Sequence, residues 1–140
     1  MDKSTFNFLQ KVAYDYSDTK RRIAEIENEI LYGTHSSDDD VQAGRTSVRN
    51  NTDITSLKAI SLVEDTRLVT LRKQIDAIDH VFETLICEKK DFIQMLYWSV
   101  PRKSIQMIAY DEKNGISERT AYRWRREFLT EVGKKLGLVE

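Results

Sequence analysis

The sequence is poor in the residues that interrupt helices and in those that form disulfides or metal sites. Its 140 residues contain one proline, five glycines and one cysteine. Cys87 therefore has no partner for an intramolecular disulfide, which is typical of proteins in reducing compartments. His35 and His80 have no Cys or His at the spacing of metal ligands, so we expect no metal site and no cofactor. Scarce glycine and proline, with 32% charged residues, favour a soluble all-α protein.

The sequence also lacks the signals of membrane proteins and enzymes. No apolar run approaches the roughly 20 residues that a membrane-spanning helix needs, and residues 1–4 do not resemble a signal peptide. We therefore expect a cytoplasmic protein with no membrane partner. No nucleophile–base pair, metal cluster or glycine-rich phosphate loop is recognisable, so we expect no enzymatic activity and no catalytic residues.

Positive charge is concentrated near the C-terminus. Between residues 101 and 135 there are nine basic and five acidic residues, which makes this segment +4 and leaves −5 for the remainder of a chain whose net charge is −1. This asymmetry predicts that the C-terminal part meets an anionic partner.

Residues 1–32 are predicted to form N-terminal helices, with Ser4 or Thr5 as the first cap. Apolar residues repeat as in a coiled coil, at Leu9, Val12, Tyr16, Ile23, Ile26 and Ile30. Weak helix formers at residues 17–19 predict a break, with one helix ending near Tyr14 and a second running from Asp18 to Leu31.

Residues 33–52 form a polar segment without periodicity, which predicts a linker. Asp38, Asp39 and Asp40 lack the alternating oxygen ligands and the closing Glu of a calcium loop, which favours a solvated acidic turn.

Residues 53–87 predict a long coiled-coil-like helix that begins at Thr52 or Asp53. Its apolar positions step by three and four residues, at Leu68, Leu71, Ile75, Ile78, Phe82 and Leu85. Such a helix, ~50 Å long, has to pack on the N-terminal helices, on a second copy or on both. We expect a helical hairpin that also self-associates, as a homo-oligomer (dimer or tetramer).

Residues 88–140 predict a helix-turn-helix DNA-binding module. A polar stretch at residues 88–91 precedes a short amphipathic helix with Phe92, Ile93, Leu96 and Tyr97. The next helix is predicted to start at residues 99–101, with Ser99 as cap and Pro101 in the first turn. It carries Ile105, Ile108 and Ala109 inward, and a turn at Gly115 leads into a second helix. Gly115 comes six positions after Ala109, which makes this turn longer than is usual for the motif.

The recognition helix is predicted in the stretch that begins at Gly115, G-I-S-E-R-T-A-Y-R-W-R-R. Ser117 is placed to cap it and Ile116 to pack back on it. Ala121 and Trp124 fall on one face, and we assign Trp124 and Phe128 to the core. The arginines fall largely on the opposite face, as in a helix that enters a DNA groove. An ordinary solvated helix face is the alternative.

The chain resembles the phage late transcription regulators of the RinA and ArpU type from viruses of Gram-positive bacteria. The resemblance rests on I-S-E-R-T-A-Y-R-W-R-R-E-F-L-T-E-V-G-K-K-L-G from Ile116, and on D-F-I-Q-M-L-Y before it. The C-terminal module of that family is similar to the promoter-reading region 4 of sigma factors. The resemblance implies a sequence-specific activator of phage late (packaging and structural) genes, acting on double-stranded DNA in the bacterial host cytoplasm.

Roles for single residues follow from the position of the recognition helix. Residues near its N-terminus reach base edges, namely Ser117, Glu118, Arg119, Thr120 and Arg123. Arg119 and Arg123 suit guanine, whereas Glu118 suits cytosine or simply the helix N-terminus. Contacts to phosphates are expected from Tyr122, Arg126, Arg102 and Lys103. Arg125 is placed to the side.

Two other functions compete with a transcription regulator. One is a DNA-packaging recognition subunit like a small terminase, which would form a closed ring of many copies. The other is an interaction module that binds host RNA polymerase or another protein without DNA specificity, and it predicts no salt-dependent binding to duplex DNA.

Overall fold

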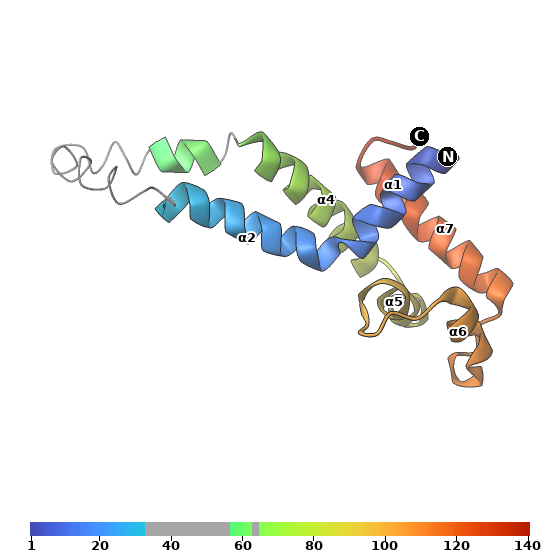
Figure 1. Ribbon diagram of the computed structural model, residues 1–140. Coiled ribbons are helices and arrows are strands. Elements are labelled where there is room, and N and C mark those ends of the chain that lie inside the picture. Colours follow the sequence, from blue (N-terminus) through green and yellow to red (C-terminus); the bar gives the residue numbers. More distant parts are fainter. Residues whose placement is uncertain (33–56, 63–64) are drawn as a thin grey trace, which may run out of the picture. The chain divides into compact units, whose positions relative to one another are not determined.

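The computed structural model describes residues 1–32, 57–62 and 65–140. Regular structure in these ranges is entirely helical (Figure 1), as the composition predicts. The predicted linker at residues 33–52 and the predicted helix start at Thr52 or Asp53 lie outside the described residues. Besides a helical segment at residues 57–62, the elements are α1 (Lys3–Tyr14), α2 (Tyr16–Tyr32), α4 (Thr66–Glu83), α5 (Cys87–Ile93), η1 (Gln94–Trp98), α6 (Ile105–Tyr110), η2 (Glu112–Asn114) and α7 (Glu118–Lys135).

The described chain forms two compact units. The first contains Met1–Asp18 and Lys73–Glu140, and the second contains Thr19–Arg72. The chain passes from one unit to the other within α2 and within α4. No helix in the described ranges is long and apolar enough to cross a membrane.

In the second unit, α2 contacts α4 through ion pairs. Glu27 Oε1 lies 2.7 Å from Arg72 Nη2, and Glu29 Oε2 lies 3.8 Å from Arg67 Nη1. Ile26 of α2 and Leu68 of α4 are buried within this unit. The other apolar positions of the predicted pattern in this unit, Ile23, Ile30 and Leu71, are half-buried.

The predicted helix over residues 53–87 is interrupted at both ends of α4. Asp65 is not helical, because its carboxylate accepts from the backbone N–H of Arg67 (2.9 Å) and so begins α4. The Arg67 guanidinium, which donates to the same carboxylate, lowers the pKa of Asp65. At the other end, Thr84 N–H donates to Val81 O at 3.1 Å and ends α4 at Glu83.

The N-terminal helices separate two residues before the predicted break. Asp15 lies between α1 and α2, whereas residues 17–19 are helical. The cap of α1 is Asp2 rather than Ser4 or Thr5, and its carboxylate accepts from Thr5 N–H at 2.7 Å. The first helix thus ends at Tyr14 as predicted, whereas the second begins two residues earlier than predicted and ends one residue later, at Tyr32.

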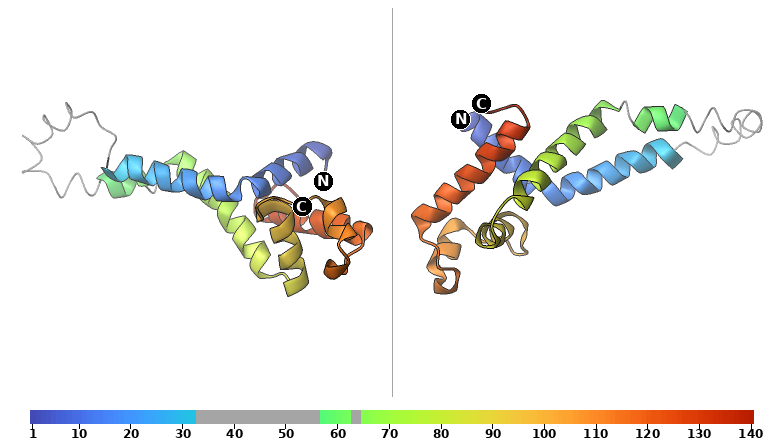
Figure 2. Two further views of the ribbon diagram at one scale, coloured as in Figure 1. Left: turned by 60° about the horizontal axis from the view of Figure 1, so that its bottom comes forward. Right: turned by 180° about the vertical axis from the view of Figure 1, so that it is seen from behind.

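The core of the first unit is formed by α1, α4, α5, η1, α6 and α7. Here α1 crosses α7 (Figures 1 and 2). Leu9 of α1 is fully buried at this crossing. A Cβ built on Gly133 of α7 would lie 2.9 Å from Leu9 Cδ1 and 2.7 Å from Val139 Cγ2. Glycine at position 133 is therefore what permits α1 and the C-terminal residues to approach α7 so closely.

The segment before α6 differs from the prediction in two places. Residues 88–91 are part of α5 rather than a break, and the Lys90 ammonium lies 5.8 Å from the centre of the Phe82 ring. Helix α6 begins at Ile105 and not at residues 99–101, because Ser104 is the cap and accepts from Met107 N–H at 3.2 Å. Ser99 instead donates its hydroxyl to Met95 O at 2.8 Å.

Tyr97 gives a prediction about stability. Its side chain is buried, its hydroxyl has no hydrogen-bond partner among the described residues, and burial raises its pKa. A raised pKa means that the fold favours the neutral phenol, so this contribution is complete below the unfolded-state pKa of about 10 and is lost as pH rises above it. We expect Tyr97→Phe to keep or raise the free energy of unfolding by up to about 1 kcal/mol at neutral pH and to reduce its alkaline loss.

Urea unfolding at neutral pH and above about pH 10 measures both effects. Tyr110→Phe is the matched control, because Tyr110 is 90% exposed. Equal alkaline loss in wild type and Tyr97→Phe would contradict the prediction.

Candidate nucleic-acid interface

The site predicted for nucleic acid lies in the first unit, where α6 contacts α7. The extended turn between them is ordered by a short 3₁₀ helix, η2, capped by the Asp111 carboxylate, which accepts from Lys113 N–H at 3.1 Å. The Asn114 side chain donates to Ile108 O at 3.0 Å and fastens η2 to α6. Gly115 follows with φ of 61°, the left-handed conformation that the sequence predicted and that glycine adopts without strain. The extra residues therefore form one helical turn.

The start of α7 is fixed by Ser117. Its hydroxyl accepts from Thr120 N–H at 3.1 Å and donates to Thr120 Oγ1 at 2.9 Å, which confirms the predicted cap. A cap of this kind stabilises a helix by about 1 kcal/mol. Ile116 is buried in the core before it, also as predicted. Ser117 and Thr120 therefore have structural roles besides any contact to DNA.

The two faces of α7 separate by polarity. Ala121 and Phe128 are buried, and the Trp124 ring meets the Phe92 ring edge-on with centroids 5.8 Å apart. The opposite side carries exposed residues predicted to read DNA, namely Ser117, Glu118, Arg119, Arg123 and Arg126. Thr120 is half-buried. The first turns of α7 thus expose a face that carries arginines, and the apolar face on the opposite side packs against the core.

Only one of these arginines has an ion pair among the described residues. Arg123 Nε lies 3.8 Å from Glu127 Oε1, and the Arg123 side chain remains 65% exposed. Glu127 Oε2 is also 3.4 Å from Lys89 Nζ. Exposed pairs of this kind contribute little to stability, so the Arg123 guanidinium can exchange its partner for an anion at small cost.

Tyr122 and Arg125 lie on the flank of this face. Tyr122 accepts a hydrogen bond from Gln106 Nε2 of α6 at 2.8 Å and is 38% exposed. The Arg125 guanidinium lies near two rings, 5.2 Å from the centre of Tyr122 and 5.1 Å from that of Phe6 in α1. The sequence placed Arg125 to the side, and nothing in its pattern pointed to the ring from α1.

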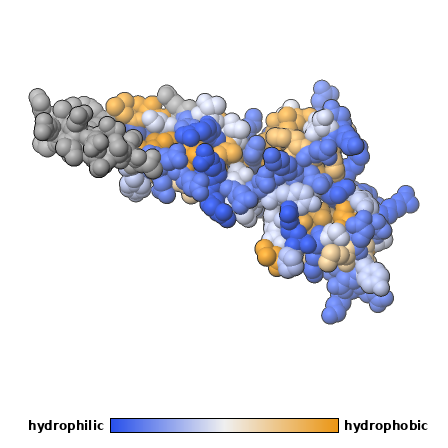
Figure 3. Space-filling model, viewed as in Figure 1, coloured by the Kyte–Doolittle hydropathy of each residue, from blue (hydrophilic) through white to orange (hydrophobic). Residues whose placement is uncertain are grey.

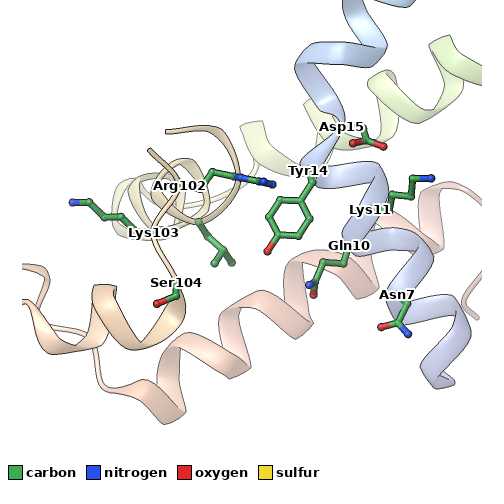
Figure 4. A pocket seen from close by; sticks show the side chains of 9 residues that line it. Asn7, Gln10, Lys11, Tyr14, Asp15, Arg102, Lys103 and Ser104 are labelled. Carbon is green, nitrogen blue, oxygen red and sulfur yellow. The ribbon is translucent and has the colours of Figure 1, made fainter. Parts of the chain in front are cut away.

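Arg102 and Lys103 occupy a different neighbourhood. They line an open cavity of about 620 Å³ together with residues of α1 and η1. Figure 4 shows Arg102 pointing to Tyr14, and its guanidinium is 4.5 Å from the ring centre. The Lys103 ammonium points away from that ring, and its backbone N–H donates to Met95 O at 3.1 Å. The structure therefore groups these two residues with α1 in a cavity whose lining includes none of the arginines of α7.

The surface over α6 and α7 is largely hydrophilic on the side seen in Figure 3. Nowhere in the described ranges are three or more His, Cys, Asp or Glu side chains grouped so that they could hold a metal ion. The chemistry that this face offers is consequently that of guanidinium, hydroxyl and carboxylate groups on a rigid helix, which suits recognition of a polar, anionic partner.

Comparison with known proteins identifies a family. A family model described as "Protein of unknown function (DUF722)" matches residues 7–134. The chain belongs to the DUF722 family. The match includes most of α1 and all of α7 except its last residue, so it covers most of the core and the arginine face of this DUF722 chain together. Searches of curated proteins and of solved structures gave no match.

Proposed function

We propose that this DUF722 chain is a sequence-specific DNA-binding transcriptional regulator, in which α6, η2 and α7 form a helix-turn-helix and α7 is the recognition helix. One observation carries the proposal: a capped helix whose buried face fixes the orientation of an exposed Arg119 and Arg123 in its first two turns. In known modules of this kind, the N-terminal residues of the second helix contact base edges. Guanidinium groups there bind guanine through two hydrogen bonds.

The connection between the helices is compatible with this arrangement. The left-handed Gly115 turns the chain into α7, and Ala121, with no exposed surface, lets the second helix lie close to its neighbours. The additional turn in η2 is held by the Asn114 bond to α6, so it need not loosen the angle between α6 and α7. The proposal that the regulator activates phage late genes rests on the resemblance to the RinA and ArpU regulators.

The second unit is proposed as the part that joins protomers. The contacts of α2 with α4 suit an intramolecular hairpin. Apolar side chains stay exposed beside it, with Leu57 62% and Ile60 49% exposed. They lie three residues apart and hence on one helix face, which a second copy would cover. Dimers or tetramers would then carry paired recognition helices to paired half-sites.

The test is recovery of DNA by the purified full chain. Fragmented genomic DNA of a phage that encodes it is incubated with the protein, and the bound fragments are sequenced. We expect one enriched site upstream of a late operon, bound with an affinity that falls as salt rises. Recovery of no site would overturn the proposal, and a ring of many copies in solution would favour the packaging subunit.

A second candidate function is binding to host RNA polymerase without DNA specificity. It is favoured by exposed apolar side chains near α6, with Val100 99%, Tyr110 90% and Met107 58% exposed. Contiguous exposed apolar patches often mark protein interaction sites, and Met107 and Tyr110 lie three residues apart in α6 and hence on one helix face. Cross-linking of the chain to polymerase that is lost in Tyr110→Ser, in the absence of any DNA recovery, would support this function instead.

A further inference from the structure

A cleft lies between the start of α1 and the outer side of α7. It has a volume of about 470 Å³ and is lined by Met1, Asp2, Lys3, Phe6, Tyr122, Arg125 and Arg126. Two of these, Tyr122 and Arg126, belong to the face of α7 predicted to contact DNA. The cleft is thus a direct continuation of that face onto a helix more than 100 residues away in sequence.

The charges in the cleft favour an anion. Its lining includes three cationic side chains, Lys3, Arg125 and Arg126, and one carboxylate, Asp2. That carboxylate already accepts from Thr5 N–H, a bond that lowers its pKa. None of the three cations has an ion-pair partner among the described residues. The charges of the side chains that line the cleft therefore sum to +2, with Asp2 included.

The contacts of Arg125 favour its binding to an anion. Its guanidinium lies near the rings of both Phe6 and Tyr122, and its buried Nε has no hydrogen-bond partner in the part of the chain that the structure describes. Tyr122 is itself fixed by Gln106 of α6. Contact with two rings restricts the guanidinium, so less conformational entropy is lost when it binds an oxyanion.

We infer that this cleft binds the phosphodiester backbone of duplex DNA beside the groove that α7 enters, with Lys3, Arg125 and Arg126 as its cations. The inference rests on the proposed function and extends the interface to α1. A phosphate here fixes the position and orientation of the recognition helix but carries no sequence information. Lys3 and Arg125 are the residues that it adds to those predicted from the sequence.

The experiment is a binding titration of the full chain at several salt concentrations, on the recovered genomic site and on a scrambled duplex. We compare wild type with Lys3→Ala, Lys3→Glu and Arg125→Gln. Each neutral replacement is expected to weaken binding to both duplexes by the same factor and to reduce the slope of log K against log salt by about one. Lys3→Glu should weaken both more strongly.

Lys73→Ala is the matched control, because Lys73 is an exposed lysine of α4 outside the cleft. If wild type binds and Lys3→Ala, Lys3→Glu and Arg125→Gln all match Lys73→Ala, the cleft does not contact DNA, although the proposed function stands. If Lys3→Ala changes only the preference for the genomic site, its role is base reading and the inference is wrong. If wild type binds neither duplex, the proposed function fails, and this inference with it.

Discussion

Replacing Arg119 or Arg123 with alanine is expected to cost about 1–3 kcal/mol in binding to the recovered genomic site and much less in binding to a scrambled duplex. The physical reason is geometric. Each guanidinium lies on the exposed face of the first two turns of α7, whose opposite face is locked by the buried Ala121 and Phe128. A rigid helix can present two hydrogen-bond donors to one guanine edge, and alanine leaves that edge unpaired.

The measurement is a pair of titrations for each variant, one on the recovered site and one on the scrambled duplex. Arg22→Ala removes the same charge from an exposed position of α2 and serves as control. The ratio of the two affinities should fall for Arg119→Ala and Arg123→Ala and stay constant for Arg22→Ala. Full affinity and full selectivity in both α7 variants would refute the assignment of α7 as recognition helix.

Replacing Leu9 with alanine is expected to lower the free energy of unfolding by about 2–5 kcal/mol. Leu9 is fully buried where α1 crosses α7, close to Gly133. Removal of three side-chain carbons leaves a cavity that two helices can close only by moving together, and Gly133 already permits the closest approach. A loss of this size is a large fraction of the stability of a small domain.

Chemical unfolding is measured for Leu9→Ala and for Phe8→Ala at the neighbouring position. The comparison distinguishes the packing of α1 on α7 from effects within α1 alone. Phe8 is on the same helix but is 45% exposed. We expect only a small loss for Phe8→Ala. Similar losses for the two variants would indicate that α1 does not pack on α7 in solution, and would also remove the basis for a cleft between these helices.

The best predicted parts of the fold are those set by neighbours in the sequence. The Ser117 cap, the left-handed Gly115 and the inward Ala121 each depend on residues at most four positions away, and the structure agrees with all three. The ends of several helices were predicted less accurately. The sequence offers several capping side chains close together, such as Ser99 and Ser104, and the surrounding packing selects one of them.

The long helix over residues 53–87 shows the limit of periodicity. A pattern of three and four residues requires only that one face be apolar. It continues across Thr84 to Leu85, whereas the positions in phase before Asp65, Ser61 and Glu64, are polar. Whether the backbone continues as well depends on hydrogen bonds that the pattern does not contain. The Asp65 carboxylate caps α4 at one end, and the Thr84 N–H closes its last turn at the other.

For the candidate interface, the sequence alone determined the all-helical class, the start of α7 and the residues on its exposed side, because helical spacing and capping are local properties. Only the tertiary structure decided what lies next to that side. It placed Arg102 and Lys103 in a cavity with residues of α1, and it brought Lys3 and Phe6 to Arg125. That neighbourhood arises from the crossing of α1 over α7, which depends on buried contacts between residues more than 100 positions apart and leaves no periodic signal in either helix.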